Sequence, residues 1–120
     1  MYDHIGLKVK DLDVAVRFYE AALAPLGHVL GSHEQSYAGL GPKDAPGLWL
    51  YAAPITAVSG THLAFRAPSR DAVQRFYDAG LKAGGRDNGT PGLRIDYSPD
   101  YYAAFLIDPD GNNVEAVFMK

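Results

Sequence analysis

The chain repeats itself, and this duplication constrains its fold more than any other feature of the sequence. His4 and His62 begin two similar segments that lie 58 positions apart (62 − 4 = 58), and the segments align without a gap. Residues 17–23 (RFYEAAL) match residues 75–81 (RFYDAGL) at five of seven positions. A repeat that covers a whole strand-plus-helix register predicts two copies of one structural unit.

The length and composition describe an ordinary globular chain. Its 120 residues, 48% of them hydrophobic, are enough to bury a core. We expect one domain over residues 1–120, with module one at about 1–55 and module two at about 56–120. The net charge of −3 and the lack of a basic stripe argue against a nucleic-acid partner. The absence of cysteine excludes disulfides and thiolate metal sites.

No segment of the sequence points to a membrane. No apolar run approaches the length that crosses a bilayer, so we expect no membrane partner. The first residues lack the basic and apolar regions of a signal peptide, so we expect a cytoplasmic protein.

Each copy of the repeat has the pattern of a strand, a helix and three more strands. Residues 3–9 alternate in polarity, and Asp11 is a helix N-cap followed by apolar residues at helical spacing. In the second copy the strand is 61–67 and the cap is Ser69. The other strands are expected at 28–33, 35–40 and 47–52, and at 86–92, 93–97, 101–107 and 113–119. Two helices cannot cover both faces of the strands, so the α+β fold must leave one face open or cupped.

Strand parity places three candidate metal ligands on the open face: His4, His62 and Glu115. The apolar residues that alternate with them are expected to face the helices: Ile5, Leu7 and Val9; Leu63, Phe65 and Ala67; Val114, Ala116 and Phe118. Two imidazoles and one carboxylate suit divalent Fe, Mn, Zn, Ni or Co and leave coordination positions for substrate. Strand histidines are also common as ordinary polar residues, and the residues alone leave both interpretations open. His28 and His33 have no repeat partner and are expected at the surface.

Three segments resemble motifs of the vicinal oxygen chelate superfamily: 3–5 (DHI), 61–65 (THLAF) and 108–115 (DPDGNNVE). This superfamily includes glyoxalase I, bleomycin-resistance proteins, extradiol dioxygenases and fosfomycin-modifying enzymes, and the resemblance extends over essentially the whole chain. It implies two tandem βαβββ modules that form a cupped eight-stranded mixed sheet with helices on the outer face. It also implies a divalent metal in the cup, a homodimer, and a small-molecule substrate that chelates the metal through adjacent oxygens.

The resemblance assigns His4, His62 and Glu115 to the metal-ligand positions of the superfamily. Glyoxalase I has a fourth ligand on the last strand of module one, where this chain carries Trp49 and its neighbours. No carboxylate stands there, which argues against the methylglyoxal–glutathione isomerase reaction. Trp49 and Tyr51 face the cup by parity and are expected to bind substrate.

Further candidates lie between residues 94 and 102. Arg94 is expected to bind a substrate carboxylate or phosphate. Tyr97, Tyr101 and Tyr102 are placed to hydrogen-bond a substrate or to act as an acid, and we take Tyr97 and Tyr102 as the catalytic candidates. Packing at a strand end or at a dimer contact is the competing interpretation of these tyrosines.

Two functions are compatible with this pattern. The first is a metal-dependent lyase, transferase or dioxygenase that acts on a small oxygen-rich substrate. The second is a metal-free protein of the bleomycin-resistance type, which sequesters a flat ligand against aromatic side chains. The presence of all three ligand residues favours the first.

Overall fold

The structure is a computed structural model that describes residues 1–54 and 60–120. The module boundary expected between residues 55 and 56 lies outside the described residues. In the described part of the chain, no helix is both long enough and apolar enough to cross a bilayer.

The order of the elements confirms an α+β fold made of two βαβββ modules. Module one contains β1 (Ile5–Val9), α1 (Leu12–Leu23), the short 3-10 helix η1 (Ala24–Leu26), β2 (Val29–His33), β3 (Tyr37–Gly41) and β4 (Leu48–Ala52). Module two contains β5 (His62–Arg66), α2 (Arg70–Lys82), β6 (Arg86–Leu93), β7 (Tyr101–Ile107) and β8 (Asn113–Met119).

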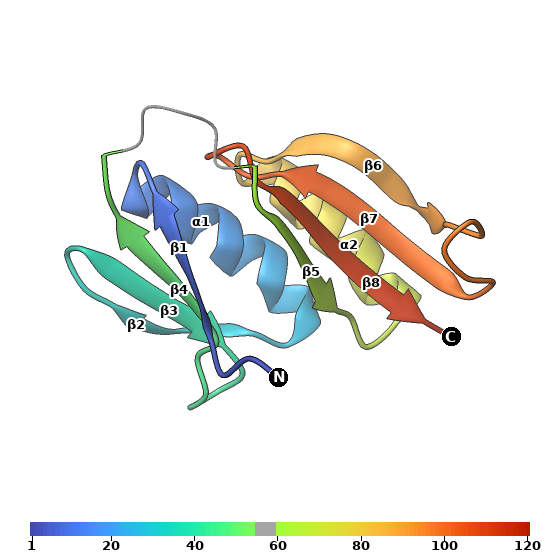
Figure 1. The fold of residues 1–120 in the computed structure, drawn as a ribbon, viewed down its shortest axis with the longest axis horizontal. Coiled ribbons are helices and arrows are strands. Elements are labelled where there is room, and N and C mark those ends of the chain that lie inside the picture. Colours follow the sequence, from blue (N-terminus) through green and yellow to red (C-terminus); the bar gives the residue numbers. More distant parts are fainter. Residues whose placement is uncertain (55–59) are drawn as a thin grey trace.

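Each module forms its own four-stranded mixed sheet, in the orders β1-β4-β3-β2 and β5-β8-β7-β6. The first and last strands of each module pair in parallel, and the remaining pairs are antiparallel. The two sheets lie side by side with β1 and β5 at their adjacent edges, and a helix packs on the same side of each (Figure 1). Within this chain, the expected eight strands are therefore divided between two sheets.

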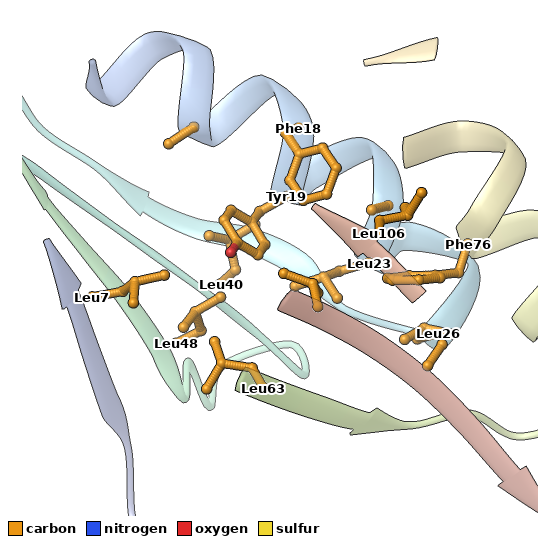
Figure 2. Packing of buried hydrophobic residues seen from close by; sticks show 14 of the residues in the cluster. Leu7, Phe18, Tyr19, Leu23, Leu26, Leu40, Leu48, Leu63, Phe76 and Leu106 are labelled. Carbon is orange, nitrogen blue, oxygen red and sulfur yellow. The ribbon is translucent and has the colours of Figure 1, made fainter. Parts of the chain in front are cut away.

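The helices begin where the sequence predicts. The Asp11 side chain accepts a hydrogen bond from the backbone N–H of Val14 at 3.2 Å, and Ser69 caps α2 in the same way through Ala72 at 3.0 Å. The two helices pack against each other across the module junction. Gly80 lets α2 approach both β7 and α1, because a Cβ there would lie 2.3 Å from the Leu106 side chain of β7 and 3.3 Å from the Phe18 ring of α1, two side chains labelled in Figure 2.

Of the apolar residues expected on the helix face of β1, Leu7 and Val9 are buried and Ile5 is 37% exposed.

Two local expectations are wrong. The strand predicted at 93–97 ends at Leu93, since Arg94 begins a turn in which its carbonyl accepts from the N–H of Tyr97 at 2.9 Å. His28 is half-buried, not a surface residue, and its Nδ1 atom is inaccessible to solvent.

The turn between β7 and β8 is locked to module one by a buried carboxylate. Asp108 is only 2% exposed, and its side chain accepts hydrogen bonds from the backbone N–H groups of Asp110 and Asn112, each at 2.8 Å. It also accepts from the Asn112 side-chain amide at 2.8 Å and from the hydroxyl of Tyr19 on α1. A second tie joins the same turn to the end of β1, because the N–H of Lys10 donates to Asp110 at 2.8 Å. The turn thus stabilises itself and the junction of the modules.

The Tyr19 hydroxyl is the hydrogen-bond donor from module one in this network. Burial, followed by the neighbouring Asp108 carboxylate, holds the pKa of Tyr19 well above its usual range. The phenol consequently stays protonated near neutral pH, and the Asp108 carboxylate keeps its partner from module one.

Replacing Tyr19 by Phe should lower the free energy of unfolding by about 1.5–3 kcal/mol, because a buried carboxylate loses a hydrogen bond. Urea denaturation measures this change. Tyr77→Phe is the matched control, since Tyr77 occupies the same place in the repeat (19 + 58 = 77) but bonds Asp87 near the surface. A Tyr19→Phe protein no less stable than the Tyr77→Phe protein would contradict the role given to this bond.

Candidate functional site

Two of the predicted ligands, His62 and Glu115, meet on the face of the second sheet that lies away from α2. Nδ1 of His62 lies 3.1 Å from the carbonyl oxygen of Asn113, its partner in the parallel pairing of β5 with β8. A carbonyl only accepts, so Nδ1 carries the proton and donates it. Nε2 then faces Glu115, whose Oε1 lies 3.0 Å away. The backbone of β8 therefore orients the imidazole toward the carboxylate.

Glu115 is buried even though it projects from the sheet face opposite the helices, and it is only 2% exposed. Its second oxygen, Oε2, accepts a hydrogen bond from the hydroxyl of Tyr101 on β7. Burial and this hydrogen bond raise the pKa of Tyr101 to about 12, so the phenol remains a donor near neutral pH. Tyr101 therefore donates to one oxygen of the carboxylate, and Nε2 of His62 lies next to the other.

Aromatic rings surround this pair. The ring of Phe105 stacks against His62 with centroids 6.3 Å apart and an interplanar angle of 21°. The Arg94 guanidinium lies 5.3 Å above the Phe105 ring. The rings of Tyr97 and Tyr101 pack edge to face, with their centroids 5.1 Å apart. These contacts restrict the positions of the imidazole and of the phenol that bonds Glu115.

Arg94 is held in place by backbone atoms. Its Nη1 donates to the carbonyl of Gly92 at 2.9 Å and its Nη2 to the carbonyl of Thr90 at 2.6 Å. These bonds fold the side chain back onto β6, which contains both carbonyls, and use two of the five N–H donors of the side chain. Arg94 therefore both stabilises the end of β6 and neighbours the aromatic cluster.

His4 lies on the first sheet, away from the His62–Glu115 pair. It precedes β1, and its Nδ1 is 2.7 Å from a carboxylate oxygen of Asp3. It shares a shallow hollow with Tyr37, Trp49 and Tyr51, so the structure gathers His4 and the two predicted substrate-binding aromatics in one place.

The predicted ligand set is thus divided between the two modules. Among residues 1–54 and 60–120, no three His, Asp or Glu side chains gather closely enough to hold one metal ion. His62 and Glu115 form a pair, whereas His4 is not brought to them within a single chain. His4 also lies just before its strand and His62 at the start of its own, whereas the expected strands 3–9 and 61–67 each began one residue before the histidine.

The tyrosines divide across the two faces of β7. Tyr102 is 9% exposed, and its hydroxyl accepts a hydrogen bond from the Gln74 side chain of α2 at 2.8 Å. It therefore lies on the helix side of the sheet, and Tyr101 is the residue that reaches Glu115. Parity along β7 and β8 carries this signal, because Tyr101 and Phe105 share a face and Phe105 pairs with Glu115. That register cannot be seen in either strand alone, which is why Phe105 was not among the residues expected in the site.

Comparisons with known proteins identify the same family and fold over nearly the whole chain. The model of the Glyoxalase/Bleomycin resistance protein/Dioxygenase superfamily matches residues 2–116. A glyoxalase/bleomycin resistance protein from Albidiferax ferrireducens T118 is 32% identical over 100% of this chain and 99% of its own, and its crystal structure matches with a TM-score of 0.84. A search of the curated proteins found no match.

More distant structures share the fold alone. A glyoxalase/bleomycin resistance protein/dioxygenase family enzyme from Burkholderia phytofirmans PsJN has a TM-score of 0.74 at 15% identity, covering 98% of each chain. A glyoxalase-related enzyme from Fulvimarina pelagi has a TM-score of 0.72 at 18% identity, covering 95% of this chain and 84% of its own.

Trp49 owes its position in the hollow of His4 to a glycine on the neighbouring strand. A Cβ at Gly39 would lie 2.7–2.9 Å from three atoms of the indole ring, so Gly39→Ala should push Trp49 toward solvent. The chain has one tryptophan, so a red-shifted fluorescence emission and stronger acrylamide quenching would report this movement directly. Gly31→Ala is the control, because a Cβ there meets only a carbonyl oxygen at 3.9 Å. Identical spectra for the two variants would contradict the proposed packing.

Proposed function

The chain belongs to the Glyoxalase/Bleomycin resistance protein/Dioxygenase superfamily, and on this basis we propose that it is a metal-dependent enzyme acting on a small oxygen-rich substrate. We assign the divalent metal to His62 and Glu115 from one chain and His4 from a second copy. The observation that carries the proposal is the His62–Glu115 pair, with its imidazole oriented by a main-chain carbonyl.

The donor chemistry of the pair fits a divalent ion. Metal-binding histidines usually donate their second ring N–H to a carbonyl or carboxylate, as Nδ1 of His62 does. Nε2 consequently has a free lone pair, and that lone pair is directed at a carboxylate oxygen 3.0 Å away. Two ligands in adjacent positions of an octahedral ion with bonds of ~2.1 Å lie ~3.0 Å apart. The spacing of the pair is therefore compatible with a cation shared between them.

The third ligand leads to a homodimer. One chain carries His4 in the hollow on module one and the His62–Glu115 pair on the sheet of module two, and it does not bring them together. In a twofold dimer, the hollow of His4 in each copy would face the His62–Glu115 pair of the other, and two equivalent three-ligand sites would form. The expected eight-stranded cup would then be built from one sheet of each chain.

The side chains around this composite site have distinct roles. A bound divalent ion would supply Lewis-acid stabilisation of negative charge on substrate oxygens. Tyr101 holds the Glu115 carboxylate in its ligating orientation and retains its proton because its pKa is about 12. Phe105 supports the His62 ring from one side. Trp49 and Tyr51 provide flat surfaces on which a planar substrate would stack.

Arg94 would select for charge on the substrate. The donors that its two backbone bonds leave available would bind a substrate carboxylate or phosphate beside Phe105. Where glyoxalase I has a fourth ligand, β4 offers Trp49 and Tyr51, so we favour a lyase, transferase or dioxygenase reaction over glutathione-adduct isomerisation.

The tyrosines divide into different roles. Of the two catalytic candidates from sequence, Tyr102 lies on the helix side of β7, which leaves Tyr97 as the candidate for contact with substrate. Tyr101 is a positioning residue, because it acts through Glu115.

A metal-free ligand-sequestering protein is the second candidate, and one observation supports it. With a proton on Nε2 as well as on Nδ1, His62 would donate to one oxygen of Glu115 while Tyr101 donates to the other, so the buried carboxylate would have partners without a cation. A flat ligand held by Trp49 and Tyr51 would then need no metal. The cytoplasmic location expected from sequence stays a prediction under both functions.

Metal binding separates the two candidates. Protein stripped with EDTA and titrated with Co²⁺ or Zn²⁺ should take up about one ion per chain, as a site of three protein ligands requires. His62→Ala and Glu115→Gln should each weaken binding by more than about 100-fold, and Tyr101→Phe by about 10-fold because it only orients a ligand. His33→Ala, which alters an exposed histidine beside Asp13, is the matched control. Equal affinities for all of these proteins, or no uptake at all, would favour the metal-free candidate.

Mixing two defective proteins tests the shared site. His4→Ala and His62→Ala should each abolish tight metal binding when pure. After co-refolding, random pairing makes half of the dimers mixed, and each mixed dimer has one intact site, so about a quarter of the sites should return. Recovery of none of the sites, alongside normal dimerisation, would assign the ligands to a single chain.

A further inference from the structure

A hollow of about 720 Å³ lies at the carboxyl ends of β5 and β8, which run side by side in the second sheet (Figure 1). Among the described residues that line it, Arg66 is the only charged one, and none is a proposed metal ligand. The rest of the lining consists of one tyrosine and five apolar residues: Tyr2, Ala64, Ala67, Val117, Phe118 and Met119. The hollow thus combines a single cation with largely apolar walls.

Arg66 lies on the same face of the sheet as Glu115. Side chains alternate along a strand, so Arg66 shares a face with Ala64, and Ala64 pairs with Glu115 in the parallel register of β5 with β8. Two residues of a strand span about 6.6 Å, so the hollow adjoins the His62–Glu115 pair without including it. A small molecule can therefore reach the pair and Arg66 at the same time.

The Arg66 guanidinium is exposed and has no protein partner. In the part of the chain that the structure describes, it takes part in neither an ion pair nor a hydrogen bond. Two other arginines of module two differ, because Arg75 bonds the Asp71 carboxylate at 2.8 Å and Arg94 donates to two carbonyls. All five N–H donors of Arg66 are available, in the fork geometry that matches a carboxylate.

The charge of this face favours an anionic ligand. Arg86 lies on it as well, because its partner Ile107 in β7 alternates with Phe105, and Phe105 pairs with Glu115. The chain has a net charge of −3, yet strands β5 to β8 present two arginines on this face against one buried carboxylate. A carboxylate suits a lone arginine, since one bidentate pair satisfies both charged groups.

We propose that Arg66 is a specificity-determining residue that binds a carboxylate of the substrate, while the apolar walls beside it contact the segment between this carboxylate and the metal-binding oxygens. The substrate is then an organic acid with an apolar body. This inference rests on the proposed function, because it takes the molecule in the hollow to be the substrate of that site. Arg94 lies over Phe105 on the β7 side of Glu115 and Arg66 on the β5 side, so the two arginines contact different groups of the substrate.

The test compares 4-tert-butylbenzoate with 4-tert-butylbenzamide, which have nearly the same shape and differ in charge. Full-length protein stripped of metal by EDTA is titrated with each compound, and the arginine Nε–H resonances are followed by NMR. We expect the benzoate to shift the Arg66 resonance and to bind about ten-fold more tightly than the amide, because hydrogen bonds between charged groups are the stronger ones. No binding, saturation without movement of this resonance, or equal affinities for the two compounds overturns the proposal.

Variants assign the preference to one side chain. Arg66→Gln should remove the ten-fold preference and Arg66→Lys should restore part of it, since lysine keeps the charge without the fork. Arg86→Gln is the matched control, at the opposite corner of the same face, and should keep the preference. Met119→Glu, at a lining position that is 55% exposed, should remove the preference by placing a carboxylate beside Arg66. A full preference in Arg66→Gln overturns the assignment.

Zn²⁺ uptake by the same proteins separates this inference from the proposed function. Arg66→Gln should take up Zn²⁺ as the unaltered protein does, because Arg66 is not a ligand. Unaltered protein that takes up Zn²⁺ but does not prefer the benzoate overturns this inference alone. Unaltered protein that prefers the benzoate but takes up no Zn²⁺ contradicts the metal-dependent function, and Arg66 then serves the ligand of the metal-free candidate.

Discussion

The architecture depends on one buried carboxylate, that of Asp108. A carboxylate without partners in this position would cost several kcal/mol, and here it accepts four hydrogen bonds, three from its own turn and one from Tyr19 of the other module. The turn leads directly into β8, whose third residue is Glu115. The bond that joins the modules therefore also determines where the strand of the candidate site begins. Structural and functional parts of the molecule share this short segment.

The two modules use the same scaffold to present different chemistry. The repeat places His4 and His62 at equivalent sequence positions, each at the entrance of a strand with a parallel neighbour. On that neighbour, module two carries Glu115 and module one carries Trp49 and Tyr51. The two copies of the repeated unit thus differ in chemistry: module two offers a carboxylate and module one offers an aromatic surface. Our proposal that two copies assemble the site follows from this division.

Much of the fold was predictable because local patterns determine it. Helical spacing and the caps at Asp11 and Ser69 located both helices, and the motifs of the superfamily are confirmed by the family match over residues 2–116. The errors arose where distant contacts decide the outcome. The Arg94 side chain bonds back to two carbonyls of β6 just before the turn, and the half-buried position of His28 depends on how the modules meet. Alternation along one strand identified the face of Glu115, but the contact with Tyr101 needed the register between two strands.

The hydrogen bond between His62 and the backbone at residue 113 has a consequence for how this chain tolerates change. Its acceptor is a main-chain carbonyl, which every amino acid supplies, so substitutions at position 113 that keep the strand paired preserve the orientation of the imidazole. The contact from Tyr101 to Glu115 has no such protection, because it requires one particular side chain. Sequence drift within this site would therefore alter the surroundings of the carboxylate long before it released the histidine.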